Sequence, residues 1–357
     1  MYRILSINPG STSTKIALYD DEQEVFNKTL RHSEVELSQF DSIIDQADFR
    51  YQVVMDALAE SDINIQKLSA VVGRGGLIKF IPGGTYAITP GLLADVRKSE
   101  KGEHASNLGA ILAHDIASSL NLPSYIVDPV VVDEMEPIAR ISGHPEIERI
   151  SIFHALNQKA VAYRYAKSVN KKYEDLNLII AHLGGGISVG AHRKGKVIDV
   201  NNALNGDGPF SPERAGGLPV GDLAKLCFSG KYSEKEIKKM ITGNGGYVSY
   251  LSTNDGRNVD EMVDQGDEYA GLIRDALGYQ VAKEIGMCAA VLKGQVDQII
   301  LTGGLAHGKY LTDYISRRVE FIAPVSVYPG ENEMSALTDG ALRILRGEEE
   351  AKNYDDY

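Results

Sequence analysis

The stretch that constrains this chain most is its beginning, where two apolar segments between Arg3 and Tyr19 flank a short polar turn. The segments predict two adjacent strands, and Gly10 lets the backbone bend between them. The turn carries hydroxyls and a cation, at Ser11, Thr12, Ser13, Thr14 and Lys15. Hydroxyls, turn amides and a lysine suit a triphosphate. The alternative is an ordinary hairpin, because serine and threonine favour turns for local hydrogen bonding alone.

A second stretch, Leu178 to His192, repeats the plan of apolar strand, glycine-rich turn and apolar strand. Neither stretch ends in the Gly-Lys-Ser/Thr of a P-loop, and neither is followed at once by the helix that a dinucleotide fingerprint requires. We therefore predict two phosphate hairpins in two related halves with a cleft between them.

Length and composition set the class of protein. A chain of 357 residues favours two domains, and 43% apolar with 24% charged residues is typical of a packed enzyme. The net charge of −12 argues against nucleic acid or an anionic membrane as partner, so anionic substrates must meet local cations. Two cysteines, no leader and no apolar run of roughly 20 residues predict a cytoplasmic protein.

Two candidate residues in the first half follow short buried strands. Arg74 lies among glycines after Ser69–Val72, where bare backbone leaves a guanidinium able to reach an anion; the alternative is surface charge in a turn. Asp128 follows the strand Ser124–Val127, at the edge where α/β sheets bind ligands; the alternative is a turn-forming or helix-capping aspartate before proline.

The second half adds further candidates. His154 opens a helix, where a histidine is more often structural than catalytic. Arg214 is a second glycine-flanked cation, in the long loop Asn205–Gly217. Gly303 and Gly304 follow the strand Gln298–Leu301 and suit either the flat face of a nucleoside or close packing.

Six motifs together resemble the butyrate kinases over nearly the whole chain. They are Asn8–Lys15, Gly73–Gly76, His182–Gly186, Pro212–Gly217, Thr302–Leu305 and Glu331–Glu333. Butyrate kinases are similar to acetate kinases and to the group of sugar kinases, actin and chaperone ATPases. The resemblance implies an α/β fold of two duplicated domains with ribonuclease H-like, mixed five-stranded sheets, ATP in the interdomain cleft, and a homodimer or larger homo-oligomer.

The resemblance also implies site residues. Asn8 and Glu333 would lie near Mg²⁺, while Arg214 and His154 would stabilise the transferring phosphoryl group and Asp128 would replace the family's catalytic aspartate. The ATP/ADP site would be lined by Asn8, Ser11, Ser13, Lys15, His182, Gly184, Gly185, Gly186, Asp255, Gly256, Arg257, Gly303, Gly304, Leu305 and His307. Acetate kinases read Arg-x-x-His-Gly-Gly where this chain reads Gly-Arg-Gly-Gly, so Arg74 is displaced from the family's carboxylate-binding arginine.

The implied reaction joins a short-chain carboxylate to the γ-phosphoryl group of ATP and yields an acyl phosphate. A carboxylate is already ionised at pH 7 and needs no general base, so Asp128 is expected to orient an arginine or a metal-bound water. The alternatives are a sugar kinase, in which Asp128 is a true base, and a non-catalytic or chaperone-type ATPase. The glycine-flanked arginines argue against the first, and the lack of length for a peptide-binding domain argues against the second.

The predicted domains are residues 1–150 and 151–346, with the last helix free to pack back on the first domain and a frayed acidic tail at 347–357. Helical spacing predicts helices within 40–60 and 107–120, from 154, over 268–292 and from 335.

Overall fold

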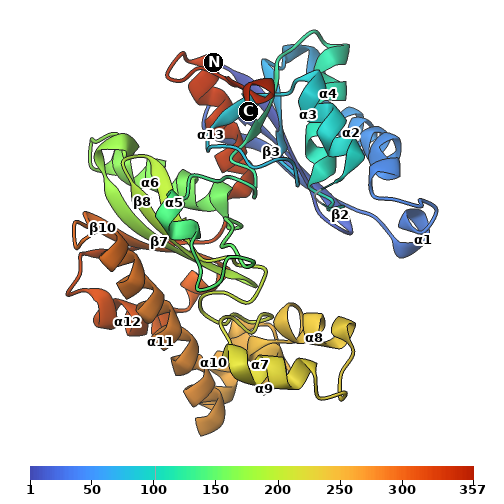
Figure 1. The fold of residues 1–357 in the computed structure, drawn as a ribbon. Coiled ribbons are helices and arrows are strands. Elements are labelled where there is room, and N and C mark those ends of the chain that lie inside the picture. Colours follow the sequence, from blue (N-terminus) through green and yellow to red (C-terminus); the bar gives the residue numbers. More distant parts are fainter. Residues whose placement is uncertain (101) are drawn as a thin grey trace. The chain divides into compact units, whose positions relative to one another are not determined.

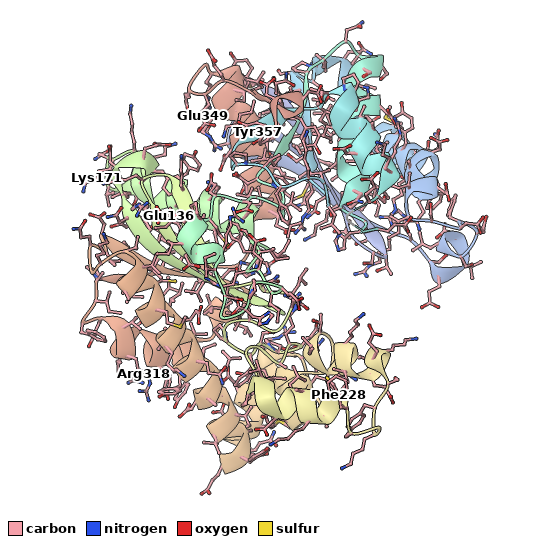
Figure 2. All side chains as sticks on the ribbon, in the orientation of Figure 1. Glu136, Lys171, Phe228, Arg318, Glu349 and Tyr357 are labelled. Carbon is pink, nitrogen blue, oxygen red and sulfur yellow. The ribbon has the colours of Figure 1, made fainter. Side chains whose placement is uncertain are left out.

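The computed structural model describes residues 1–100 and 102–357, which form two compact units (Figure 1). One unit contains Met1–Val132 and Asn332–Tyr357, and the other contains Asp133–Glu331. The expected boundary near residue 150 differs from this division because the preceding segment is bonded to the second unit. The backbone N–H of Glu136 donates to the Ile198 carbonyl over 3.0 Å, and Arg149 forms a 2.9 Å ion pair with Asp199. The side chain of Glu136, labelled in Figure 2, is paired with Arg193.

The strands form one mixed sheet in each unit. The first sheet contains β1 (Arg3–Pro9), β2 (Ser13–Asp20), β3 (Gln23–Arg31), β4 (Ala70–Arg74), β5 (Thr85–Ala87), β6 (Ser124–Val127) and β12 (Lys352–Asn353). The second contains β7 (Asn177–Leu183), β8 (Ile187–Arg193), β9 (Lys196–Val200), β10 (Gln298–Gly303) and β11 (Val325–Pro329).

The two sheets share one topology, which confirms the predicted duplication. The order β6-β4-β1-β2-β3 in the first matches β11-β10-β7-β8-β9 in the second. In the first sheet, β1, β2 and β3 pair antiparallel, and β4 and β6 are added in parallel on the other side of β1. In the second sheet, β7, β8 and β9 pair antiparallel, and β10 and β11 are added in parallel on the other side of β7. Both predicted hairpins are present, as β1–β2 and β7–β8. The expected five strands hold for the second sheet. The first has seven, because β5 pairs with β6 and the tail strand β12 pairs with β5.

The helices of the first unit are α1 (Glu34–Leu37), α2 (Ala47–Glu60), α3 (Pro90–Lys98), α4 (Asn107–Ser119) and α13 (Glu333–Leu345). Those of the second are α5 (Pro137–Arg140), α6 (Ala155–Ser168), α7 (Val220–Cys227), α8 (Glu234–Ile241), α9 (Gly246–Leu251), α10 (Gly256–Asp264), α11 (Glu268–Val291) and α12 (Lys309–Val319).

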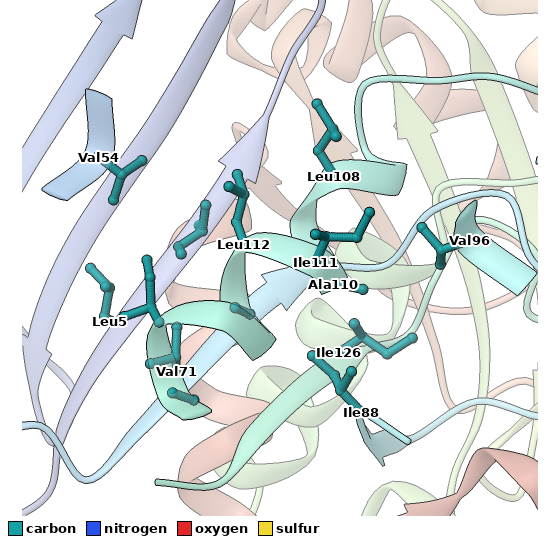
Figure 3. Packing of buried hydrophobic residues seen from close by; sticks show 14 of the residues in the cluster. Leu5, Val54, Val71, Ile88, Val96, Leu108, Ala110, Ile111, Leu112 and Ile126 are labelled. Atoms are coloured by element: carbon teal, nitrogen blue, oxygen red, sulfur yellow. The ribbon is translucent and has the colours of Figure 1, made fainter. Parts of the chain in front are cut away.

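Alternation along β1 places helices on both faces of the first sheet. Leu5 and Ile7 belong to a core that includes Leu108 and Ile111 of α4. Figure 3 shows Leu5, Leu108 and Ile111 in this core. Ser6 points to the opposite face, where its hydroxyl lies 2.7 Å from that of Thr338 in α13. The last helix of the chain therefore covers the sheet formed by the first residues.

The second sheet is layered in the same way. Leu178 and Ile180 pack against Val161 of α6, whereas the intervening Ile179 packs in the cluster that includes Leu277 of α11. α6 begins one residue after the predicted start at 154, and α11 ends one residue before the predicted end at 292.

The tail is ordered, so the prediction of a frayed acidic end was wrong. Lys352 pairs with Tyr86 across β12 and β5. The ring of Tyr354 is fully buried, and its hydroxyl donates to Asp95 Oδ2 over 2.7 Å. An aromatic side chain supplies the apolar burial that the surrounding acidic residues lack. Among the described residues, no helix combines the length and apolarity needed to cross a bilayer.

Candidate functional site

The turn between β1 and β2 carries the first group of predicted site residues. The amide of Gly10 donates to the Ser13 carbonyl over 2.7 Å and closes the turn. Asn8 is nearly buried at the end of β1, whereas Ser11 and Lys15 are exposed. The structure thus places an amide side chain, hydroxyls and a cation around one turn.

Asn8, Arg74 and Glu333 form a cluster in the first unit, although they come from β1, the end of β4 and the start of α13. Arg74 Nη1 lies 2.7 Å from Glu333 Oε1 and 3.3 Å from Asn8 Oδ1. Asn8 Nδ2 donates to Glu333 Oε2 over 2.6 Å. The start of a helix also favours the Glu333 carboxylate. The structure therefore brings together the two predicted magnesium residues and the first predicted arginine.

The oxygen atoms of this cluster are of the kind that magnesium binds. Mg²⁺ is usually held by one or two carboxylates, with water and substrate phosphates supplying the other ligands. Glu333 and the Asn8 oxygen are of the correct type, and Arg74 and Asn8 already donate to the two Glu333 oxygens. The residues fit an ion that they contact through its bound water. Among the described residues, no group of three or more His, Cys, Asp or Glu side chains is placed to hold a metal.

The glycines around Arg74 have a packing role, which corrects the interpretation that they serve to bare the backbone. A Cβ on Gly73 would lie 2.0 Å from the Gly109 carbonyl oxygen of α4. One on Gly76 would lie 2.2 Å from Asn107 Oδ1. Close approach of α4 to the sheet requires these glycines, and the guanidinium is held by Glu333.

Asp128 lies at the carboxyl end of β6, as predicted, and is nearly buried. Its Oδ1 accepts a hydrogen bond from the Gly84 amide over 2.7 Å, and its own amide donates to the Gly84 carbonyl. Its φ of 37° is in the left-handed region, which aspartate tolerates better than most residues. The carboxylate therefore anchors the loop before β5.

In the second unit, the rings of His154 and His182 are stacked. Their centroids lie 3.7 Å apart, and the planes differ by 9°. His182 Nδ1 lies 2.8 Å from Asn157 Oδ1, which can only accept, so this nitrogen carries a proton. His182 Nε2 lies 3.2 Å from Glu331 Oε1, but not in hydrogen-bonding geometry. The imidazole at the start of α6 and the imidazole near the end of β7 thus form a stacked pair.

A buried chain of hydrogen bonds holds His154, and it was not predicted from the sequence. Gln158 Nε2 donates to the Ser188 carbonyl and hydroxyl over 3.0 and 2.9 Å. Gln158 Oε1 therefore faces His192 Nε2, 2.9 Å away, while His192 Nδ1 accepts from the Tyr173 hydroxyl over 2.6 Å. Ser188 Oγ lies 2.9 Å from His154 Nδ1. Because that oxygen already accepts from Gln158 Nε2 and from the backbone N–H of His154, its own proton is directed to His154 Nδ1.

Burial, with a smaller effect from the Lys159 charge, holds the pKa of His192 well below its usual value and keeps the ring neutral. Within this chain of hydrogen bonds, Gln158, Ser188 and His192 are fully buried, while His154 is half-buried. Since the His192 ring is neutral, each group donates to the next, from the Tyr173 hydroxyl to His154.

Arg214 lies against the turn between β7 and β8. A Cβ on Gly186 would fall 1.8 Å from Arg214 Nη1, and the same nitrogen donates to the Ala203 carbonyl. Burial lowers the pKa of Arg214 from its usual value, although an arginine remains charged at neutral pH. Ser211, from the same loop, donates to the Gly185 carbonyl over 2.5 Å. The loop thus presents its cation at the glycine turn.

Of the predicted nucleotide residues, Gly303 contacts the end of β7 beside this turn, and Leu305 contacts the start of α10. Gly303 has φ +90°, and a Cβ there would lie 2.4 Å from the Leu183 carbonyl oxygen, so the close-packing alternative accounts for this glycine. A Cβ on Gly304 would have no described atom within 4 Å. Leu305 packs against Gly256 at the start of α10, where a Cβ on Gly256 would lie 2.6 Å from Leu305 Cδ2.

Three of the predicted nucleotide residues, Asp255, Gly256 and Arg257, lie at the start of α10. Asp255 is the N-cap and accepts from the Arg257 amide over 2.9 Å. Arg257 Nη2 lies 2.6 Å from Asp255 Oδ2, and this hydrogen bonding holds the pKa of Asp255 at about 2.

Two further carboxylates were not predicted: Glu331, beside His182 and Gly184, and Glu213, which accepts from Asn254 over 2.6 Å. Glu213 follows Pro212 in a motif already noted, and that position was the available signal.

Comparison with known proteins agrees with this geometry. Residues 146–320 match the acetokinase family. The chain is 59% identical over 354 residues to butyrate kinase 1 of Clostridium acetobutylicum, covering 99% of this chain and 100% of that protein. It is 58% identical to butyrate kinase 2 of the same organism, covering 99% of each.

Among solved structures, the fold matches acetate kinase of Porphyromonas gingivalis with a TM-score of 0.80 at 18% identity, over 96% of this chain and 99% of that one. It matches acetate kinase of Entamoeba histolytica with a TM-score of 0.76 at 15% identity, over 95% and 98%. These likenesses establish the fold, and the full-length identity near 59% establishes the family. The chain belongs to the butyrate kinases, within the acetokinase family.

Proposed function

We propose that this chain transfers the γ-phosphoryl group of ATP to the carboxylate of butyrate, reversibly, to give butyryl phosphate and ADP. The observation that carries the proposal is the 59% identity over nearly the whole chain to a protein named butyrate kinase. Branched or shorter acids are expected to react as well, because one methylene in an apolar pocket is worth only about 1–3 kcal/mol.

The chemistry requires charge neutralisation more than proton transfer. A carboxylate with a pKa near about 4.3 is already ionised at pH 7, so it attacks phosphorus without a general base. Bringing one anionic charge to another costs about 4 kcal/mol at 4 Å and an effective dielectric of about 20. Arg74 in the first unit and Arg214 in the second are the cations that we assign to the carboxylate and the phosphoryl group.

We assign the phosphates to the two hairpin turns and the nucleoside to the residues that converge around Gly304 and Leu305. His154, oriented through Ser188, would donate a hydrogen bond to a phosphoryl oxygen. Mg²⁺, when bound with ATP, would neutralise phosphate charge, and Asn8 with Glu333 would orient its bound water. Asp128, which holds the Gly84 loop, has a positioning role in this scheme rather than that of a base.

We further propose a homodimer or larger homo-oligomer, as the family resemblance implies. Four apolar side chains of α11 are largely exposed, namely Tyr269, Leu272, Tyr279 and Met287. Light scattering on the purified chain measures this directly, and a monomer at micromolar concentration would contradict it.

The product provides the direct test of the activity. The mixed anhydride formed from butyrate and ATP reacts with hydroxylamine to give a hydroxamate, whereas a sugar phosphate or free phosphate does not. Hydroxamate should therefore form in step with ADP when butyrate is the acceptor, and not with glycerol. ADP release with butyrate but without hydroxamate would overturn the assignment.

Direct transfer is tested separately. Asp128, His154 and Glu333 are chemically able to carry a phosphoryl group. The enzyme is mixed with γ-labelled ATP and Mg²⁺ without acid, quenched, and examined for label on the protein. We expect none, because the substrate is itself a competent nucleophile. Stoichiometric label that butyrate discharges into butyryl phosphate would show a two-step reaction instead.

A further inference from the structure

A buried arginine on α2 holds the turn between β1 and β2. Arg50 is 1% exposed, and its guanidinium donates to three carbonyls of the turn. Nη1 lies 2.7 Å from the Gly10 oxygen and 3.1 Å from the Ser13 oxygen, while Nη2 lies 3.0 Å from the Ser11 oxygen. The remaining N–H groups donate to Gln46 Oε1 over 2.8 and 3.1 Å. One side chain thus gathers most of the carbonyls of the turn on its inner side.

The fourth carbonyl of the turn is also satisfied inside the protein. The Thr12 oxygen accepts from the backbone N–H of His32 over 2.9 Å. Within residues 1–100 and 102–357, by contrast, the amides of Ser11 and Thr12 have no backbone or side-chain acceptor, and both residues are exposed. The turn is therefore polarised, with carbonyls directed inward and amides left for solvent or a ligand. Consecutive amides of this kind form an anion-binding concavity.

The charge on Arg50 lacks a carboxylate partner among the described residues. Its hydrogen-bond acceptors are neutral, and burial lowers its pKa to about 10, so it remains a cation at neutral pH. The neighbouring His32 supplies no counter-charge, because an imidazole is either neutral or cationic; burial and the Arg50 charge lower the pKa of its ring and favour the neutral form. A buried charge without a counter-charge carries a desolvation cost. A bound anion near the turn would offset that cost.

We propose that Arg50 is the positioning residue of the first phosphate site: it fixes the turn with its amides outward, and its positive charge is compensated by a phosphate group of the nucleotide. This rests on the proposed function, in that the ligand is a nucleoside di- or triphosphate. Arg50 acts through the backbone of Gly10, Ser11 and Ser13 and does not itself touch the nucleotide.

The test compares ligands with and without phosphates. Calorimetry with Mg²⁺ measures the dissociation constants of ADP and adenosine for the wild type and for Arg50→Gln. We expect Arg50→Gln to weaken ADP binding about tenfold or more, because it removes the charge and most of the donors to the turn. Adenosine binding should change less than twofold, since the residues assigned to the nucleoside belong to the other unit. Arg50→Lys retains the charge but has fewer donors, and should fall between the two.

Arg3→Gln is the matched control. Arg3 lies at the opposite end of the same hairpin and is paired with Asp20 at 2.6 Å, so its loss perturbs the same strands without touching the turn. It should leave the preference for ADP over adenosine unchanged. If Arg50→Gln does not fold, as judged by circular dichroism, Arg50→Lys alone decides.

The outcomes separate this proposal from the proposed function. A wild type that binds ADP no better than adenosine would contradict the proposed function before any variant is made. A wild type that prefers ADP, with that preference unchanged in both Arg50 variants, would overturn the role of Arg50 alone. Equal loss of ADP and adenosine binding would also overturn it, because it would indicate a general structural role.

Discussion

Arg214 and Gly186 are in such close contact that the glycine cannot carry a side chain without displacing the guanidinium. A Cβ at Gly186 would lie 1.8 Å from Nη1 and 2.5 Å from Cζ of Arg214. The obstructing atoms belong to the end of a flexible side chain rather than to the backbone, so the arginine can move while the fold persists. This relationship allows the position of Arg214 to be changed without removing its charge.

Arg214→Ala should lower kcat by roughly 10³-fold or more while changing the KM for ATP little, because a cation on the developing phosphoryl charge acts mainly in the transition state. Steady-state kinetics in the butyryl phosphate direction measure both constants. A decrease of less than tenfold would remove Arg214 from the site.

Gly186→Ala should lower kcat by about 10²-fold, which is typical of a displacement of about 1 Å at a reacting centre. The double variant Gly186→Ala/Arg214→Ala provides the control. If the added methyl group acts only by moving Arg214, the double variant is no slower than Arg214→Ala alone. Independent, multiplying effects would show that the methyl group disturbs the turn itself.

Glu333→Gln should raise the Mg²⁺ concentration needed for half-maximal activity, since a hard cation and its bound water prefer a charged oxygen. Its effect on stability should be below about 1 kcal/mol, because the ion pair with Arg74 is partly exposed. A Mg²⁺ titration at saturating ATP and a urea unfolding curve measure the two effects. A variant that loses stability with its Mg²⁺ titration unchanged would indicate that Glu333 serves the start of α13 instead.

Tyr354→Ala should destabilise the protein by about 3–5 kcal/mol, as expected for removal of a fully buried aromatic ring. Tyr354→Phe is the matched control and should cost only about 1–2 kcal/mol, because it keeps the ring and loses only the hydrogen bonds that the hydroxyl forms with Asp95 and with the Lys79 amide. Urea unfolding measures both. Equal stability of Tyr354→Ala and wild type would mean that the tail contributes no core packing in solution.

Local pattern predicted the elements that are defined by neighbouring residues. The two hairpins were recognised because each has apolar runs on both sides of a glycine turn, and α11 because its apolar spacing persists through the helix. The shared strand order followed from the repetition of the hairpin plan. The tail was missed because its acidic residues suggest solvation, whereas one aromatic ring determines its position.

Contacts between distant residues were beyond local pattern. Arg74 and Glu333 are both in predicted motifs, and the last helix was expected to be free to pack back on the first domain, but no local pattern indicates that its return pairs these two side chains. Gln158 and His192 resemble ordinary helix and strand residues, and only the fold aligns them behind His154. Arg50 is in an amphipathic pattern at a position where a cation is normally solvated, so its burial beneath the turn had no local signal.

The buried His192 predicts a loss of stability in acid. Its pKa in the folded state is far below about 6.5, whereas the ring in the unfolded chain titrates near that value. Below pH about 6.5 the unfolded state therefore binds one proton more than the folded state. Stability should fall as the pH is lowered from there toward the folded-state pKa, by up to about 1.4 kcal/mol per pH unit from this residue. Above pH about 6.5 His192 should contribute no pH dependence.

Urea unfolding between pH 7.5 and 5 measures this slope, and His192→Gln is the comparison, because glutamine does not titrate. The variant should be less stable than the wild type at pH 7.5, since it disrupts the hydrogen bonds to Tyr173 and Gln158. That deficit should shrink as the pH falls, because the wild type alone loses the contribution of a neutral buried imidazole. A deficit that stays constant down to pH 5 would mean that His192 accepts its proton in the folded state as readily as in the unfolded chain, and the fixed direction of the hydrogen bonds that lead to His154 would then be wrong.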